Sequence, residues 1–136
     1  MPTPTSRPRP AVLDLEQHPA AVRRARRFVQ DQCHAAGING ETSETAVLLT
    51  SEIVTNAFLH GQSGAWVTLT ASEDSLRVEV GDGSARQPRL VHTDREALHG
   101  RGLAIVDTLA AAWGATGHRR GKVVWFELTR RRPTPR

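Results

Sequence analysis

The stretch Glu52-Ile-Val-Thr-Asn56-Ala-Phe-Leu-His60-Gly61 closes a long segment, residues 46–59, that contains no glycine and no proline. Apolar residues at positions 46, 49, 53 and 57 follow the spacing of one helix face, and Gly61 stands where a helix is expected to end. Glu52, Asn56 and His60 are four residues apart, so their side chains share one side of this helix. The stretch therefore predicts a helix that carries a carboxylate, an amide and an imidazole beside a face that must be buried.

Two interpretations of this polar side are open. It can be a solvated helix surface, because exposed glutamates are common. It can also line a polar site, because polar groups placed against a core are costly unless they meet a partner or an opening. The spacing alone does not decide between them, and the choice depends on residues further along the chain.

Length and composition indicate a single globular domain. The chain has 136 residues, of which 38% are hydrophobic and 4% aromatic, enough for one core built mainly from Ala, Val and Leu. Its one cysteine, Cys33, cannot form an internal disulfide, which favours a reducing cytoplasm. No apolar run reaches membrane-spanning length, and the N-terminus lacks the apolar region of a signal peptide, so a cytoplasmic protein without a membrane contact is expected.

The formal net charge of +4 comes from the two ends of the chain. Residues 1–10 and 130–136 hold six arginines and no acidic residue, so residues 11–129 carry a net charge of −2. Both ends are also rich in Pro and Thr, which favours disorder. We therefore expect a disordered tail at 1–10, a folded domain over 11–129, a disordered basic tail at 130–136, and no direct binding of nucleic acid by the folded domain.

Hydrophobic periodicity predicts an alternation of strands and helices, and hence the fold class. The predicted elements are a strand at 11–15, a helix at 21–36, the helix ending at Gly61, strands at 65–71 and 76–80, a helix at 103–112, and strands at 115–119 and 122–129. This order predicts an α+β fold, a two-layer sandwich in which helices cover one face of a mixed, mostly antiparallel sheet.

The first predicted helix has a strongly basic side. Its arginines fall mostly opposite the apolar stripe, at positions 23, 24, 26 and 27. A solvated face is the simplest interpretation, although an acidic partner could use the same residues.

Asp82 lies between two glycines at the end of the predicted strand 76–80. An Asp in this setting is most simply part of a turn. The functional alternative is a carboxylate at the mouth of a pocket, where the glycines let a ligand approach the backbone. Residues 84–99, which follow, have no periodicity and are longer than an ordinary connection, as expected for a lid or a disordered loop.

The segment Gly100-Arg101-Gly102 precedes the predicted helix at 103–112. Glycines at the start of a helix expose backbone N–H groups, and these together with the helix dipole can bind an anion such as a phosphate. A Gly-x-Gly pair is a weak motif by itself, and it gains weight only in combination with the segments before it.

Taken in order, four segments resemble the nucleotide-binding boxes of the GHKL (Bergerat-fold, histidine-kinase-like) ATPase superfamily. Within it, the chain is similar to the anti-sigma-factor serine/threonine kinases of the RsbW and SpoIIAB types, in an actinobacterial-type branch of single-domain regulators. The segments are Ser-Glu-Ile-Val-Thr-Asn-Ala-Phe-Leu-His-Gly at 51–61, Val-Gly-Asp-Gly-Ser at 80–84, Gly-Arg-Gly-Leu-Ala-Ile-Val at 100–106 and Gly-Lys-Val-Val-Trp-Phe-Glu-Leu at 121–128. The order and spacing of all four argue against a chance match.

The resemblance implies a site for ATP and Mg²⁺. Glu52 corresponds to the general base, and Asn56 to the residue whose amide oxygen ligates Mg²⁺. Asp82 corresponds to the carboxylate that accepts a hydrogen bond from the adenine amino group. The remaining nucleotide-binding positions that the resemblance implies are His60, Gly83, Gly100, Arg101, Gly102 and Leu103.

The chain departs from the family pattern in two places. Relatives often carry Thr where this chain has Val123, so a polar contact near the adenine would be missing or replaced by water. Leu98 and His99 stand where some kinases of the group carry an Arg that faces the terminal phosphate. Both departures make nucleotide binding a safer prediction than phosphoryl transfer.

Three functions follow from these features. The resemblance implies a kinase that phosphorylates an anti-anti-sigma (STAS) partner, otherwise sequesters a sigma factor, and forms a homodimer. The first alternative is a catalytically silent module that binds ATP and acts through protein contacts. The second is a nucleic-acid-binding protein that uses its basic tails.

Overall fold

The helices and strands follow one another in the order that the sequence predicts. The computed structural model describes residues 9–60, 64–82, 100–118 and 121–130. The elements are β1 (Ala11–Leu15), α1 (Ala21–Ala35), α2 (Glu41–His60), β2 (Ala65–Ala71), β3 (Ser75–Asp82), α4 (Gly100–Leu109), β4 (Ala112–His118) and β5 (Gly121–Thr129). No helix among these residues is long and apolar enough to cross a membrane.

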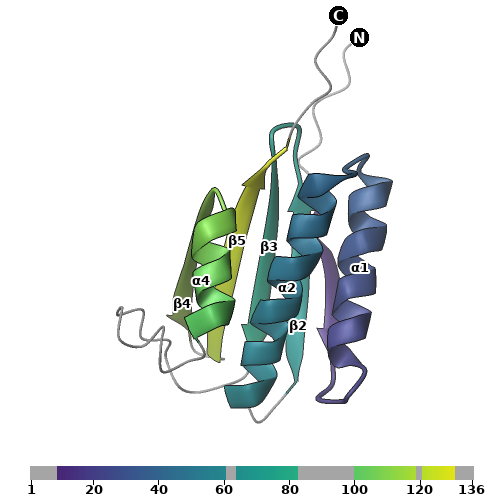
Figure 1. Cartoon of the computed structure of the whole chain (residues 1–136). Coiled ribbons are helices and arrows are strands. Elements are labelled where there is room, and N and C mark those ends of the chain that lie inside the picture. The colour runs from purple at the N-terminus through teal and green to yellow at the C-terminus, as the bar shows by residue number, and fades with distance from the viewer. Residues whose placement is uncertain (1–8, 61–63, 83–99, 119–120, 131–136) are drawn as a thin grey trace, which may run out of the picture.

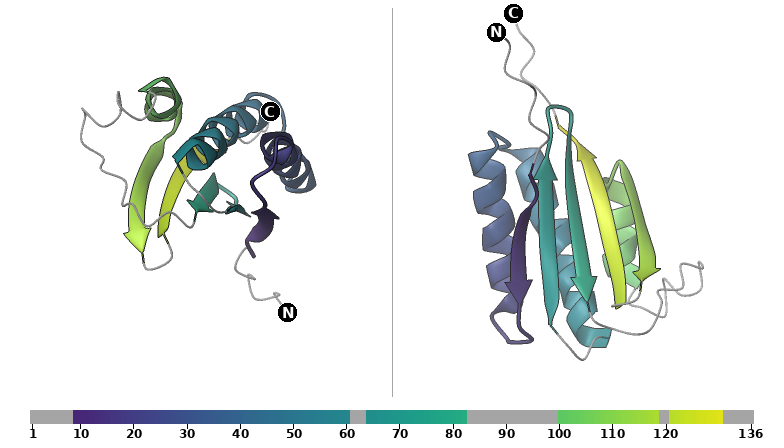
Figure 2. Two further views of the ribbon diagram at one scale, coloured as in Figure 1. Left: turned by 90° about the horizontal axis from the view of Figure 1, so that it is seen from below. Right: turned by 180° about the vertical axis from the view of Figure 1, so that it is seen from behind.

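The strands form one sheet with the order β1-β2-β3-β5-β4, and each neighbouring pair is antiparallel. The three described helices lie on one face of this sheet, with α1 over the β1 side, α2 near the centre and α4 over the β5–β4 side (Figures 1 and 2). The predicted two-layer α+β sandwich is therefore confirmed. The pairing is antiparallel throughout the described sheet, rather than only for the most part.

The core lies between the sheet and the helices. Leu76, Val78 and Val80 alternate along β3 and are almost fully buried. Phe126 and Leu128 continue this apolar layer on β5, and the buried face of α2 packs against it. Each fully buried side chain of this size stabilises the fold by about 1.5–3 kcal/mol relative to exposure. The alternation thus fixes which face of every strand points toward the helices.

Small side chains let α1 lie close to α2. Ala21, Ala25, Val29 and Cys33 form its buried stripe. Burial raises the pKa of the Cys33 thiol above its usual value, while the hydrogen-bonded Ser43 side chain acts in the opposite direction. The thiol therefore behaves as a neutral core group that links the two helices.

Arg130, the first residue of the basic segment at 130–136, fastens the end of β5 to two other parts of the chain. Its backbone N–H donates to the Asp74 carbonyl oxygen at 2.9 Å. Its guanidinium donates to the carbonyl oxygens of Ser72 and Ala36, at 3.0 and 2.5 Å. Arg130 thus joins the β2–β3 turn to the C-terminal end of α1.

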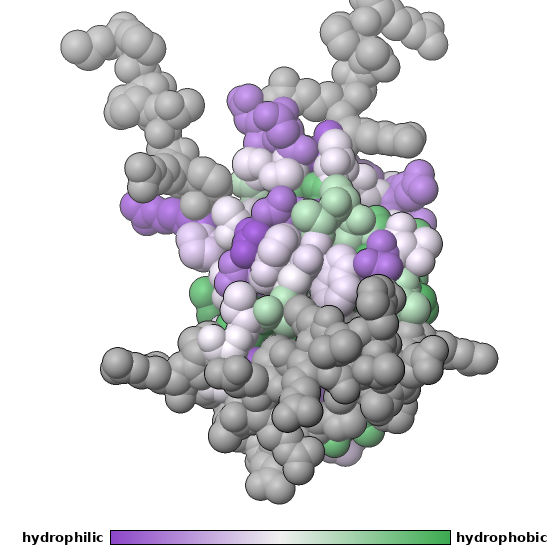
Figure 3. All heavy atoms as spheres, turned by 90° about the vertical axis from the view of Figure 1, so that its left-hand side faces the viewer, coloured by the Kyte–Doolittle hydropathy of each residue, from purple (hydrophilic) through white to green (hydrophobic). Residues whose placement is uncertain are grey.

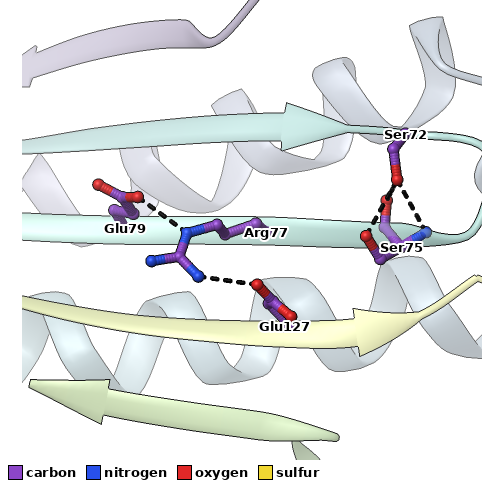
Figure 4. A network of polar contacts seen from close by, with 5 residues as sticks. All are labelled: Ser72, Ser75, Arg77, Glu79 and Glu127. Atoms are coloured by element: carbon purple, nitrogen blue, oxygen red, sulfur yellow. Dashed lines mark hydrogen bonds and ion pairs between the residues drawn. The ribbon is translucent and has the colours of Figure 1, made fainter. Parts of the chain in front are cut away.

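The face of the sheet opposite the helices is polar and carries two tryptophans. Arg77 bridges Glu79 and Glu127, at 2.9 and 2.7 Å (Figure 4). Its guanidinium also lies 4.2 Å from the centre of the Trp125 ring. These charged side chains are about one-third exposed, so each ion pair contributes little to stability. This face therefore needs no helix to cover it.

The structure corrects the predicted boundary between the last helix and the strand after it. The helix predicted over 103–112 begins at Gly100 and ends at Leu109, and Trp113 belongs to β4. The Ala111 N–H donates to the Glu127 carbonyl oxygen of β5 at 2.9 Å, and Trp113 pairs with Phe126. Three consecutive alanines favour helix locally, but sheet pairing with β5 prevails over that preference.

The α4 and β4 side of the molecule is chemically mixed. Small hydrophobic areas lie among neutral and hydrophilic residues over its described part (Figure 3). Leu109, at the end of α4, is 45% exposed. Single exposed apolar residues of this kind are ordinary on a protein surface.

Gly81 is required by packing rather than by a turn. It pairs with Trp66 across β2 and β3, and a Cβ built on Gly81 would lie 2.0 Å from Cζ2 of the Trp66 ring. The indole therefore covers the glycine on the open face of the sheet. Any side chain at position 81 would force the ring away.

We expect Gly81→Ala to lower the free energy of unfolding by about 1–3 kcal/mol, because the added methyl overpacks against Trp66. Urea denaturation measures this loss. In a Trp66→Ala background the same substitution should cost clearly less, since the ring is gone. An equal cost in both backgrounds would contradict this explanation of Gly81.

Candidate functional site

Four segments that are distant in the sequence meet at one end of the fold. They are the last turns of α2, the last residue of β3, the first residues of β5 and the first turn of α4, and Figures 1 and 2 show them at the same end of the molecule. The antiparallel register explains part of this arrangement, because it places Asp82 of β3 directly opposite Lys122 of β5. The segments that carry the sequence motifs are therefore neighbours in space.

Asp82 and Lys122 form an ion pair that faces the helix layer. Strand alternation places both residues on the same face as Val80, which is buried, and Val124, which packs against the core. The Lys122 Nζ lies 3.9 Å from Asp82 Oδ2, and the two side chains are 12% and 3% exposed. A carboxylate this deeply buried is costly without compensation, and the ammonium supplies an opposite charge at its side.

Glu52 and Asn56 lie on the side of α2 that faces α4. Thr45 lines a groove together with Leu109 of α4, which fixes the direction of that side. Glu52 and Asn56 follow Thr45 by seven and eleven residues, close to two and three helical turns. Both are half-buried. The predicted common side is thus confirmed for these two residues, and it borders the core rather than bulk solvent alone.

The structure describes the backbone of the remaining predicted site residues only in part. Gly100, Arg101, Gly102 and Leu103 form the first turn of α4, so the predicted helix start next to the glycines is present. The side chains of these residues and of His60 lie outside the described part of the structure. Gly83 and the proposed lid at 84–99 also lie outside it.

The register places Val123 on the other face of the sheet. Val123 pairs with Gly81 and Thr116, and Gly81 is the residue that Trp66 covers on the open face. The side chain at position 123 therefore points away from Asp82. Lys122, rather than the residue at position 123, is the polar residue of β5 that faces Asp82. The missing polar contact near the adenine stays a prediction.

Lys122 is the site residue that sequence reasoning missed. The sequence pattern could have identified it, because strand alternation places Lys122 on the same face as the inward positions 124, 126 and 128. A lysine at an inward position of a strand needs a partner. Its partner is known only from the register between β3 and β5.

A second feature lies at the opposite end of the fold. A groove of about 260 Å³ is lined by residues near the start of α2, the end of α4 and the end of β5, among them Glu41, Thr45, Leu109 and Thr129. Glu52, Asn56 and Asp82, the predicted site residues whose side chains the structure describes, do not line it. The chemistry of the site is carried by the Asp82 end, where the ionisable groups are buried.

The arrangement at the Asp82 end can perform three tasks. A buried carboxylate accepts hydrogen bonds, and a helix start offers backbone N–H groups to an anion. The side of α2 between them provides oxygen atoms from an amide and a carboxylate, which suit a hard cation such as Mg²⁺. Among the described residues, no group of three or more His, Cys, Asp and Glu side chains forms a metal site.

Comparison with known proteins agrees with this fold. A family model described as "Histidine kinase-like ATPase domain" matches residues 15–128. A crystal structure of the RsbU and RsbW domains of Rv1364c from Mycobacterium tuberculosis is similar, with a TM-score of 0.72 and 21% identity over 97% of this chain and 34% of that one. The SiaB–SiaC complex from Pseudomonas aeruginosa gives a TM-score of 0.63 and 13% identity, over 88% of each chain.

Because both sequence identities are low, these structural similarities establish the fold alone. The chain spans about a third of the length of the mycobacterial protein that it matches. No curated protein matches the sequence. The family model extends from the end of β1 almost to the end of β5 and so includes Glu52, Asn56, Asp82 and the first turn of α4. The chain belongs to the family of histidine kinase-like ATPase domains.

Proposed function

We propose that the protein binds Mg·ATP at the Asp82 end of the fold and acts as an anti-sigma-factor-type serine/threonine kinase. The observation that carries the proposal is the buried Asp82 carboxylate at the end of β3, inside a segment that matches the ATPase family. A buried carboxylate accepts a hydrogen bond from the adenine amino group, whereas guanine presents a carbonyl oxygen at the same place. The position thus favours ATP over GTP.

The other residues have roles along the length of the nucleotide. Asn56 ligates Mg²⁺ through its amide oxygen, and the phosphates and water complete the coordination shell. The first turn of α4, Gly100 to Leu103, binds the phosphates through backbone N–H groups. His60 and Gly83 complete the proposed set of nucleotide-binding residues. Glu52, one turn before Asn56, accepts the proton of the attacking hydroxyl group.

The partner is a STAS anti-anti-sigma protein that carries the phosphorylated Ser or Thr. The similarity to an RsbW domain and to the SiaB–SiaC complex supports a partner-switching protein, because these are the domains and complexes that those structures contain. When it is not engaged with this partner, the protein sequesters a sigma factor in the cytoplasm, as a homodimer. The exposed arginines of α1, at positions 23, 24, 26 and 27, offer a surface for an acidic partner.

A catalytically silent ATP-binding module is the alternative. Leu98 and His99, where some kinases carry an Arg, favour it. Position 123 does not, since its side chain points away from Asp82. The half-buried Glu52 on the side of α2 that faces α4 favours the kinase.

Calorimetric titration with ATP tests the binding site. We expect saturable binding that is stronger with Mg²⁺ and is lost in Asp82→Ala, because the buried hydrogen-bond acceptor is gone. Asp74→Ala is the matched control, since Asp74 is exposed in the β2–β3 turn at the other end of the strand. Absence of binding in the unaltered protein, or equal binding in Asp82→Ala, would refute the site.

Transfer of the terminal phosphate from labelled ATP to a STAS protein tests the catalytic role of Glu52. Glu52→Gln keeps the shape of the side chain but removes the base, so we expect the rate to fall about 10²–10⁴-fold while ATP affinity is retained. Glu44→Gln, an exposed position two turns earlier on α2, should leave both unchanged. Transfer at an undiminished rate in Glu52→Gln would exclude the base, and no transfer by the unaltered protein would favour the silent module.

A further inference from the structure

Lys122 is unusual both in its identity and in its position. It is the single lysine of a chain that otherwise uses arginine for its cationic side chains. It is also 12% exposed, whereas the arginines of α1 are exposed. An ammonium is a compact point charge that fits where a planar guanidinium does not. Its role is therefore not that of a general surface cation.

The fold holds Lys122 beside Asp82 through the backbone. The two residues are directly paired in the β3–β5 ladder, one strand spacing apart, and both side chains point toward the helix layer. Gly121, immediately before Lys122, has a φ of 138°, a region that favours glycine. The start of β5 thus has a backbone geometry that sets the direction of Lys122.

Together the two side chains present a hydrogen-bond acceptor next to a donor. The edge of adenine that carries the 6-amino group presents the complementary pair, an N–H donor beside the N1 acceptor. We propose that Lys122 reads the adenine base, by donating from Nζ to N1 while Asp82 accepts from the 6-amino group. This rests on the proposed ATP site and adds a specificity-determining residue to it.

The same pair opposes guanine at both positions. Guanine presents the O6 acceptor to the Asp82 carboxylate and the N1–H donor to the Lys122 ammonium. Each buried group would then face a group of its own kind and lose its hydrogen bond. The pair therefore distinguishes the two purines by two contacts rather than one.

The test combines a change in the protein with a change in the nucleotide. In the unaltered protein, 1-deaza-ATP, which keeps the amino group but lacks N1, should bind about 10–100-fold more weakly than ATP, the range for a hydrogen bond to a charged group. Lys122→Met should bind both nucleotides equally, because it cannot donate to N1. Equal affinity of the unaltered protein for the two nucleotides would overturn the proposal.

Two further results separate this inference from the ATP site itself. If ATP binds in an Asp82-dependent way and 1-deaza-ATP binds as tightly, only the role of Lys122 fails; if ATP does not bind at all, both fail.

Because Lys122→Met leaves Asp82 without its counter-charge and can fail to fold, a second measurement uses the unaltered protein. Mass spectrometry should show that ATP protects Lys122 from acetylation more than 1-deaza-ATP does at equal occupancy, and equal protection would count against the contact.

Discussion

The register between β3 and β5 is the constraint on which the site depends. It sets Asp82 opposite Lys122 and continues inward through Val80 and Val124 to the buried Val78–Phe126 pair. A slip of β5 by one residue would move Lys122 to the open face, away from Asp82, together with the core side chains of β5. The hydrophobic pattern that stabilises the sheet therefore also holds the ionic groups in place. The stability of the sheet and the geometry of the site therefore depend on the same strand register.

The two faces of the sheet explain why the candidate site lies at one end of the fold. The helices cover one face, and the open face is occupied by Trp66, Trp125 and the Arg77 ion pairs. In the described part of the chain, the buried charged residue, Asp82, lies where a strand ends. There the end of β3, the start of β5 and the start of α4 meet the last turns of α2. An end of the layer that is both buried and polar is suited to a ligand with an apolar ring and a charged tail.

Local patterns predicted much of the fold, and contacts between distant strands account for what they missed. The alternation of Leu76, Val78 and Val80 and the periodicity of α2 are properties of single segments, so the elements and their order were predicted correctly. The end of α4 was wrong because Ala111 and Ala112 join β5, a choice that helix propensity cannot show. The role of Lys122 was missed for the same reason, because the register decides that Lys122, and not Val123, faces Asp82. Glu52, Asn56 and Asp82 were predicted from motifs, whereas the folded chain was needed to show that α2 and β3 end at the same end of the molecule.

A crystal structure of the protein with Mg²⁺ and a non-hydrolysable ATP analogue tests the central claim most directly. The claim is that the buried end of the β3–β5 ladder is an adenine-binding site. We expect the adenine amino group within hydrogen-bond distance of the Asp82 carboxylate and Mg²⁺ at the Asn56 amide oxygen. An analogue bound in the groove between Glu41 and Leu109, with the Asp82–Lys122 pair untouched, would contradict it.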